Sequence, residues 1–268
     1  MSDLFIERAD RIAVVRMNRP ERRNALSIDF MRALTRTAES LRDDSSIDVV
    51  LLGGARNWFS AGADLKDDAR WSIGTKSLRE QREIDQTGYR MAQAWEQLPQ
   101  ISIAAIEGYA VGGGLALALA CDWRVMGRDA FVSLPEIGLG LPLTWGTLPR
   151  LIALVGPARA KRLTILCERI GAGDALNMGL VDYVVAQGQT EDEARSVARR
   201  VLEMPQASVR MSKETINATA YALAHLASHA GADQFSLAAA SEEAAAARAR
   251  FRTAGCAEVN PCTGGSDG

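Results

Sequence analysis

Three consecutive glycines, Gly112–Gly114, mark the first place where this chain could do chemistry. The apolar run Ile101–Ile106 precedes them and predicts a buried strand, and Leu115–Ala120 follows with good helix formers and no polar side chain. Backbone N–H groups at the start of such a helix have no partner within the helix and favour a negatively charged ligand atom. Glycine lets that atom approach without meeting a β-carbon. The triplet is equally typical of a packing turn where a helix crosses a strand.

A single acidic residue, Glu136, stands in a second such place, the apolar loop Leu134–Pro142. Glycines and prolines stiffen this loop, so we expect the carboxylate to be partly desolvated. Desolvation raises the pKa of a carboxyl group and suits it to act as a general base. A glutamate that caps a helix or forms an ion pair would give the same local sequence.

Two upstream segments have residue types that suit a ligand. Trp58–Lys66 is small in its middle and aromatic at one edge, so its backbone could lie against a ligand, or it could be a tight turn. Arg19, Arg22 and Arg23 lie within five residues, and such a cluster suits a phosphate group. A solvated turn has the same composition.

The elements that must position these residues follow an α/β pattern. Strands are predicted at Ile12–Met17, Val49–Leu52, Ile101–Ile106, Trp123–Met126, Ala130–Ser133 and Val181–Val185. Helices are predicted at Ser27–Leu41, Leu78–Gln97, Leu148–Leu154, Pro157–Leu166, Ala172–Met178, Glu191–Met204, Ala207–Leu223 and Ala232–Arg252. We therefore expect an α/β core over residues 1–200, a helical region over 201–254 and a disordered polar tail over 255–268.

Composition excludes several classes of protein. A net charge of -2 over 268 residues gives no reason to expect nucleic acid or an anionic membrane as a partner. There is no long apolar run, and the acidic N-terminus does not resemble a secretory signal. Four cysteines without zinc spacing predict a reduced, cytoplasmic protein. The two histidines, His225 and His229, are read as a solvated helix face, so no metal site is expected.

Three segments together resemble the crotonase superfamily, the enoyl-CoA hydratases and isomerases. They are Phe59–Leu65 (FSAGADL), Glu107–Gly114 (EGYAVGGG) and Leu134–Gly138 (LPEIG). Asn18–Leu26 and Ala175–Val181 add to the resemblance, which runs from about Ile12 to Phe251. Each segment alone is unspecific, but all five in this order are specific.

The resemblance implies a spiral core of repeated ββα turns and a helical C-terminal region that forms trimers, often paired into hexamers. It also implies an acyl-CoA thioester substrate and no separate cofactor. In this family two backbone N–H groups bind the thioester oxygen, and by motif they belong to Ala63 and Gly113. The remaining expected substrate contacts are Arg22, Arg23 and Lys66 at the CoA phosphates, Ala61, Asp64 and Leu65 along the adenine and pantetheine path, and Gly112 and Trp145.

The chain departs from the hydratase pattern at one position. Hydratases of the family use two glutamates to hold and activate a water molecule, and one of these matches Glu136. The other position, two residues beyond the glycine triplet, is Ala116, which can neither accept a proton nor orient water. The family's small glycine-rich run after the base is replaced by Leu143–Trp145, whose bulk would narrow the acyl pocket or occupy the water site.

One base and an oxyanion hole are enough to move a proton along an acyl chain. The preferred expectation is therefore double-bond isomerisation, in which Glu136 takes the α-proton of a 3-enoyl-CoA and returns it at the γ-carbon. The alternatives are hydration of a 2-enoyl-CoA, another crotonase reaction such as decarboxylation, hydrolysis or C–C cleavage, and a non-catalytic acyl-CoA-binding protein.

Overall fold

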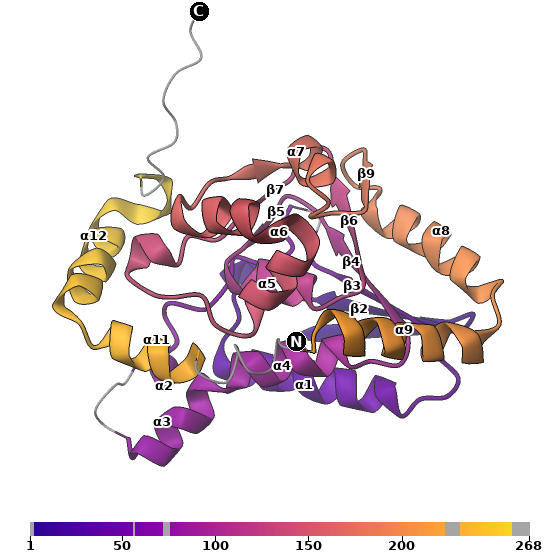
Figure 1. Ribbon diagram of the computed structural model, residues 1–268, viewed down its shortest axis with the longest axis horizontal. Helices are drawn as coiled ribbons and strands as arrows, with labels where there is room; N and C mark the ends of the chain where they lie inside the picture. Colours follow the sequence, from indigo (N-terminus) through magenta and orange to yellow (C-terminus); the bar gives the residue numbers. More distant parts are fainter. Residues whose placement is uncertain (1–2, 56, 72–75, 223–230, 259–268) are drawn as a thin grey trace, which may run out of the picture.

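Six strands form the central sheet of the computed structural model, which describes residues 3–55, 57–71, 76–222 and 231–258 (Figure 1). Their order is β1-β2-β3-β4-β6-β9, and every pair except β1–β2 is parallel. Their bounds are Leu4–Ala9, Ile12–Met17, Val49–Gly53, Ile101–Ile106, Trp123–Gly127 and Tyr183–Val185. Because β3 and β4 are buried along their whole length, the sheet is covered on both faces.

Alternate residues of each strand feed two separate cores. Ala13 and Val15 of β2 pack in the larger core with α1, α4 and α5, whereas Ile12 and Val14 pack in the smaller core with α8. Figure 1 shows α8 on one side of the sheet and α1, α4 and α5 on the other. These helices span Ile28–Arg42 (α1), Thr87–Glu96 (α4), Gly113–Leu119 (α5) and Thr190–Leu202 (α8).

A second, three-stranded sheet contributes residues to the cavity wall described below. It consists of β5 (Tyr109–Val111), β7 (Phe131–Ser133) and β8 (Ile170–Gly171) in the order β5-β7-β8. The chain turns from β4 into β5 at Gly108, whose φ is +59° and whose missing β-carbon would overlap the backbone of Asn57. The stretch Ile101–Asp122, predicted as strand, turn and helix, contains the extra short strand β5. The strands β1, β5 and β8 were not predicted from the sequence.

Most predicted helices are present, but two that were predicted as single long helices are interrupted. Ser27 caps α1 as expected, with its Oγ accepting a hydrogen bond from the Phe30 N–H at 3.3 Å. The helices predicted over residues 78–97 and 232–252 are each two helices. The predicted division between Leu154 and Pro157 is confirmed, because Gly156 has a non-helical backbone within α6. The remaining bounds are Asp68–Trp71 (α2), Leu78–Asp85 (α3), Thr147–Ile165 (α6), Ala172–Asn177 (α7), Gln206–Ala220 (α9), Gly231–Ala239 (α11) and Glu242–Glu258 (α12), with single 3₁₀ turns at Pro20–Arg22 (η1) and Ile137–Leu139 (η2).

The last two helices cover a loop of their own chain. Leu139 and Leu141, which follow Glu136, form a small buried cluster with Phe235 and Ala239 of α11. In Figure 1, α12 lies at the opposite end of the molecule from α8. Helix α12 extends to Glu258, four residues into the segment predicted to be a polar tail, and residues 259–268 lie outside the described part. None of the described helices is long and apolar enough to cross a membrane.

Candidate active site

One cavity of about 800 Å³ brings together the predicted oxyanion donors, base and substrate contacts. The predicted residues in its wall are Arg22, Arg23, Ala61, Ala63, Asp64, Leu65, Lys66, Gly112, Gly113, Ala116, Glu136 and Trp145. The wall also contains residues to which sequence analysis assigned no role, among them Tyr109, Phe131, Ser133, Cys167, Arg169 and Phe235.

Two glycine turns from distant parts of the chain lie against each other in this cavity. Gly62 has a φ of +88°, and a β-carbon built on it would lie 2.5 Å from the Val111 oxygen and 3.3 Å from the Gly113 nitrogen. Gly113 is the first residue of α5, so its N–H has no acceptor within the helix. Among the described residues, the N–H groups of Ala63 and Gly113 donate to no protein acceptor. Two such free donors, one of them at a helix start, can bind an oxyanion.

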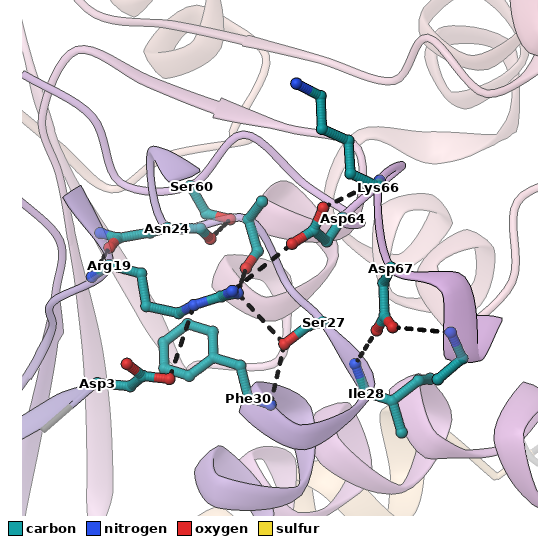
Figure 2. Close-up of polar contacts among 12 residues, drawn as sticks. Asp3, Arg19, Asn24, Ser27, Ile28, Phe30, Ser60, Asp64, Lys66 and Asp67 are labelled. Carbon is teal, nitrogen blue, oxygen red and sulfur yellow. Dashed lines mark hydrogen bonds and ion pairs between the residues drawn. The ribbon is translucent and has the colours of Figure 1, made fainter. Parts of the chain in front are cut away.

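Buried Asn24 holds the first of these turns in place (Figure 2). Its Nδ2 donates to the carbonyl oxygens of Met17 at 3.3 Å and Phe59 at 3.1 Å, and its backbone oxygen accepts from Ser60 Oγ at 2.8 Å. Ser60 Oγ in turn accepts from the Gly62 N–H at 3.1 Å. Asn24 lies in one of the segments that resemble the family, but its structural role has no local signal, because its partners are up to 36 residues away.

The predicted arginine cluster has two separate roles in the structure. Arg19 lies over the Phe30 ring, donates to the Ala25 oxygen, and pairs with Asp64 at 3.6 Å (Figure 2). Asp64 also accepts from the Lys66 N–H at 3.0 Å, so its carboxylate holds the loop in place. The Arg19 charge is thus used within the protein.

The other cations are positioned differently. Arg22, Arg23 and Lys66 are exposed at the cavity wall, and none of the three has an ion pair within the described part of the chain. Their charges are available to an anionic ligand, and their contact with the CoA phosphates stays a prediction.

The carboxylate of Glu136 lies directly against the second glycine turn. A β-carbon on Gly112 would come within 2.5 Å of Glu136 Oε1, and Gly112 has a φ of +52°. The backbone oxygen of half-buried Glu136 accepts from the N–H groups of Leu139 at 2.9 Å and Leu141 at 3.0 Å. A carboxylate and the free N–H of Gly113 are therefore neighbours, which is the arrangement that proton abstraction next to a carbonyl requires.

Apolar residues pack around the first turn of α5. Ala116 is 2% exposed, and the indole of Trp145 lies on Gly113 so closely that a β-carbon there would overlap it. Position 116, where the family resemblance expects a second glutamate, is thus occupied by a buried methyl group. Among the described residues, no group of three or more His, Cys, Asp or Glu could hold a metal ion, and His225 and His229 lie outside that part.

Comparison with known proteins agrees with this geometry. A family model described as enoyl-CoA hydratase/isomerase matches residues 7–253. The chain belongs to the enoyl-CoA hydratase/isomerase family. The crotonyl-CoA hydratase of Syntrophomonas wolfei is 33% identical to this family member over 216 residues, which is 80% of this chain and 81% of the relative. The short-chain-enoyl-CoA hydratase of Clostridium acetobutylicum is 32% identical, over 81% of this chain and 82% of the relative.

Solved structures of the family share the fold. The crystal structure of an enoyl-CoA hydratase from Mycobacterium avium subsp. paratuberculosis matches this family member with a TM-score of 0.83 and 28% identity, over 94% of this chain and 96% of that one. The predicted family and the predicted crotonase-like α/β fold are thereby confirmed, while the trimer stays a prediction.

Proposed function

We propose that this enzyme moves a double bond within an acyl-CoA thioester and that Glu136 is its single acid–base group. The observation that carries the proposal is that Glu136 lies against Gly112 at the start of α5, while Ala116, one turn further along the same helix, adds no second carboxylate to the cavity wall. Among the described residues, the other carboxylates in the cavity wall are Glu21, which is exposed, and Asp64, which pairs with Arg19. Glu136 is the carboxylate beside the free N–H of Gly113.

The reaction follows from these positions. The thioester oxygen of a 3-enoyl-CoA accepts hydrogen bonds from the N–H groups of Ala63 and Gly113, and Glu136 removes a proton from C2. The electron pair of that C–H bond delocalises over the thioester and the C3–C4 double bond as a dienolate, whose oxygen bears charge. Glu136 returns the proton to C4, which leaves the double bond between C2 and C3. Preorganised donors at the developing oxyanion are worth roughly 10²–10³ in rate each.

The charged residues at the cavity wall support an acyl-CoA substrate. Arg22, Arg23 and Lys66 supply three positive charges for the CoA phosphates. We expect the enzyme to work as a trimer, as the family resemblance implies.

Hydration of a 2-enoyl-CoA is the second candidate, and the names of the relatives favour it, since two of them are called hydratases. It requires a group besides Glu136 that orients water, and Ala116 cannot do so. A non-catalytic acyl-CoA-binding protein would have no use for the position of Glu136.

One experiment separates these functions. The protein is incubated with 3-hexenoyl-CoA and with 2-hexenoyl-CoA, and the products are resolved by chromatography and mass. Isomerisation gives a product of unchanged mass from 3-hexenoyl-CoA, and Glu136→Gln lowers its rate by about 10²–10⁴. Glu21→Gln is the matched control, because it changes an exposed carboxylate of the same cavity.

A product heavier by one water identifies a hydratase. Undiminished turnover by Glu136→Gln contradicts the role of Glu136, and binding without any turnover identifies an acyl-CoA-binding protein.

A further inference from the structure

The indole of Trp145 fills a slot between two helices at the cavity. On one side it lies against Gly88 of α4 and on the other against Gly113 of α5, and a β-carbon on either glycine would overlap the ring. Trp145 is 5% exposed and yet lines the cavity. The absence of a side chain at Gly88 and Gly113 leaves room for the indole, which fills the space between α4 and α5.

The backbone of Trp145 is held so that the ring cannot easily leave this slot. Its φ is +60°, a value that is rare for a bulky residue and costs free energy. The Trp145 oxygen accepts a hydrogen bond from Arg150 Nη1 at 2.8 Å, and Arg150 Nε pairs with Glu96 of α4 at 2.6 Å. Arg150 and Glu96 are both buried, so this pair joins the Trp145 turn firmly to α4.

The position of the ring determines what an acyl group meets beyond the thioester. Gly113 and Ala116 are three residues apart on α5 and so lie on one face of the helix. Both line the cavity together with Trp145. An acyl chain whose carbonyl oxygen is bound at Gly113 therefore extends along a wall that the indole closes on the side of α4.

We propose that Trp145 limits the acyl chain length that this enzyme accepts, so that its substrates are short-chain acyl-CoAs. The inference rests on the acyl-CoA binding proposed above but not on the direction or kind of the reaction. Removal of the indole opens the slot between Gly88 and Gly113 to the end of a longer chain. Each methylene that becomes buried there tightens binding about four-fold.

Binding of saturated acyl-CoAs tests the proposal, because these ligands cannot react. Dissociation constants for butanoyl-, octanoyl- and dodecanoyl-CoA are measured by calorimetry for the unmodified protein, Trp145→Gly and Trp145→Phe. Glycine accepts the φ of +60°, and phenylalanine keeps an aromatic ring in the slot if the larger change prevents folding. Leu148→Ala is the matched control, since Leu148 lies nearby at the start of α6, is 37% exposed and is outside the cavity wall.

The expected result has two parts. The unmodified protein and Leu148→Ala bind octanoyl- and dodecanoyl-CoA no more tightly than butanoyl-CoA. The Trp145 variants shift the ratio of affinities towards dodecanoyl-CoA, at least ten-fold in Trp145→Gly and less in Trp145→Phe. The proposal is overturned if the affinity of the unmodified protein already increases with every added methylene. It is also overturned if folded Trp145 variants show the same ratio of dodecanoyl-CoA to butanoyl-CoA affinity as the unmodified protein. Failure of all three ligands to bind would refute the acyl-CoA site itself, whereas turnover as a hydratase would leave the chain-length limit intact.

Discussion

Gly62 is the residue whose substitution most directly tests the paired glycine turns. Alanine at this position would place its β-carbon 2.5 Å from the Val111 oxygen, whereas ordinary contact begins near 3.4 Å. The two backbone segments must then separate by about 0.9 Å. A hydrogen bond of about 2.7–3.1 Å from Ala63 or Gly113 to the thioester oxygen does not survive such a shift.

The magnitude follows from the loss of one donor. Removing a single oxyanion donor costs roughly 10²–10³ in kcat, or about 2.7–4 kcal/mol of transition-state stabilisation. The φ of +88° costs an alanine a further 1–2 kcal/mol or so in the folded state. We therefore expect Gly62→Ala to lower kcat at least about 100-fold and the melting temperature by only a few degrees.

The assay is the steady-state turnover of whichever enoyl-CoA isomer the unmodified enzyme converts, with thermal unfolding measured on the same samples. Gly173→Ala is the matched control, because Gly173 lies in α7 and no atom lies within 4 Å of the new β-carbon. Alanine there should stabilise the helix by about 1 kcal/mol without changing kcat. A cooperatively folded Gly62→Ala enzyme with kcat within about three-fold of the unmodified value would refute the paired-turn oxyanion hole.

Three further predictions concern stability and access. Asn24→Ala leaves three buried backbone groups without partners, at a cost of about 1–3 kcal/mol each. The free energy of unfolding measured in urea should therefore fall by at least about 3 kcal/mol, and a fall of less than about 1 kcal/mol would contradict the role of Asn24. Burial alone would raise the pKa of Glu191, but the hydrogen bond and charge of Arg16 lower it overall from 4.5. Glu191 therefore contributes stability that is fully present above about pH 4.5 and is lost as the pH falls through its lowered pKa in the folded state. Glu191→Gln should reduce the loss of stability between about pH 7 and about pH 3 by at most about 1 kcal/mol, and an equal loss in both proteins would count against this. Burial raises the pKa of the Cys121 thiol to about 12, so peptide mapping after iodoacetamide treatment should find Cys121 unmodified. Half-buried Cys167 lies in the cavity wall and should be alkylated, more slowly when butanoyl-CoA is present. Rapid alkylation of Cys121, or no protection of Cys167 by butanoyl-CoA, would contradict the structure.

Local patterns were sufficient to predict much of the architecture. The apolar runs of β2, β3 and β4 and the Ser27 cap of α1 were assigned correctly, because burial on both faces and capping leave local signals. The break between α3 and α4 at position 86 was missed, because that residue is a glutamine rather than a glycine or proline. The two-residue β8 was missed because so short a strand exists only through its pairing with β7.

The sequence by itself determined the family, the glycine turns and the absence of a glutamate at position 116. Only the tertiary structure decided which distant atoms meet: Gly62 against Gly113, Glu136 against Gly112, and Trp145 between Gly88 and Gly113. The physical reason is that such contacts depend on chain segments brought together by the packing of both sheets, and a residue carries no local signal of a partner far along the chain. The bulk of Trp145 was visible in the sequence, but the slot that it closes was not.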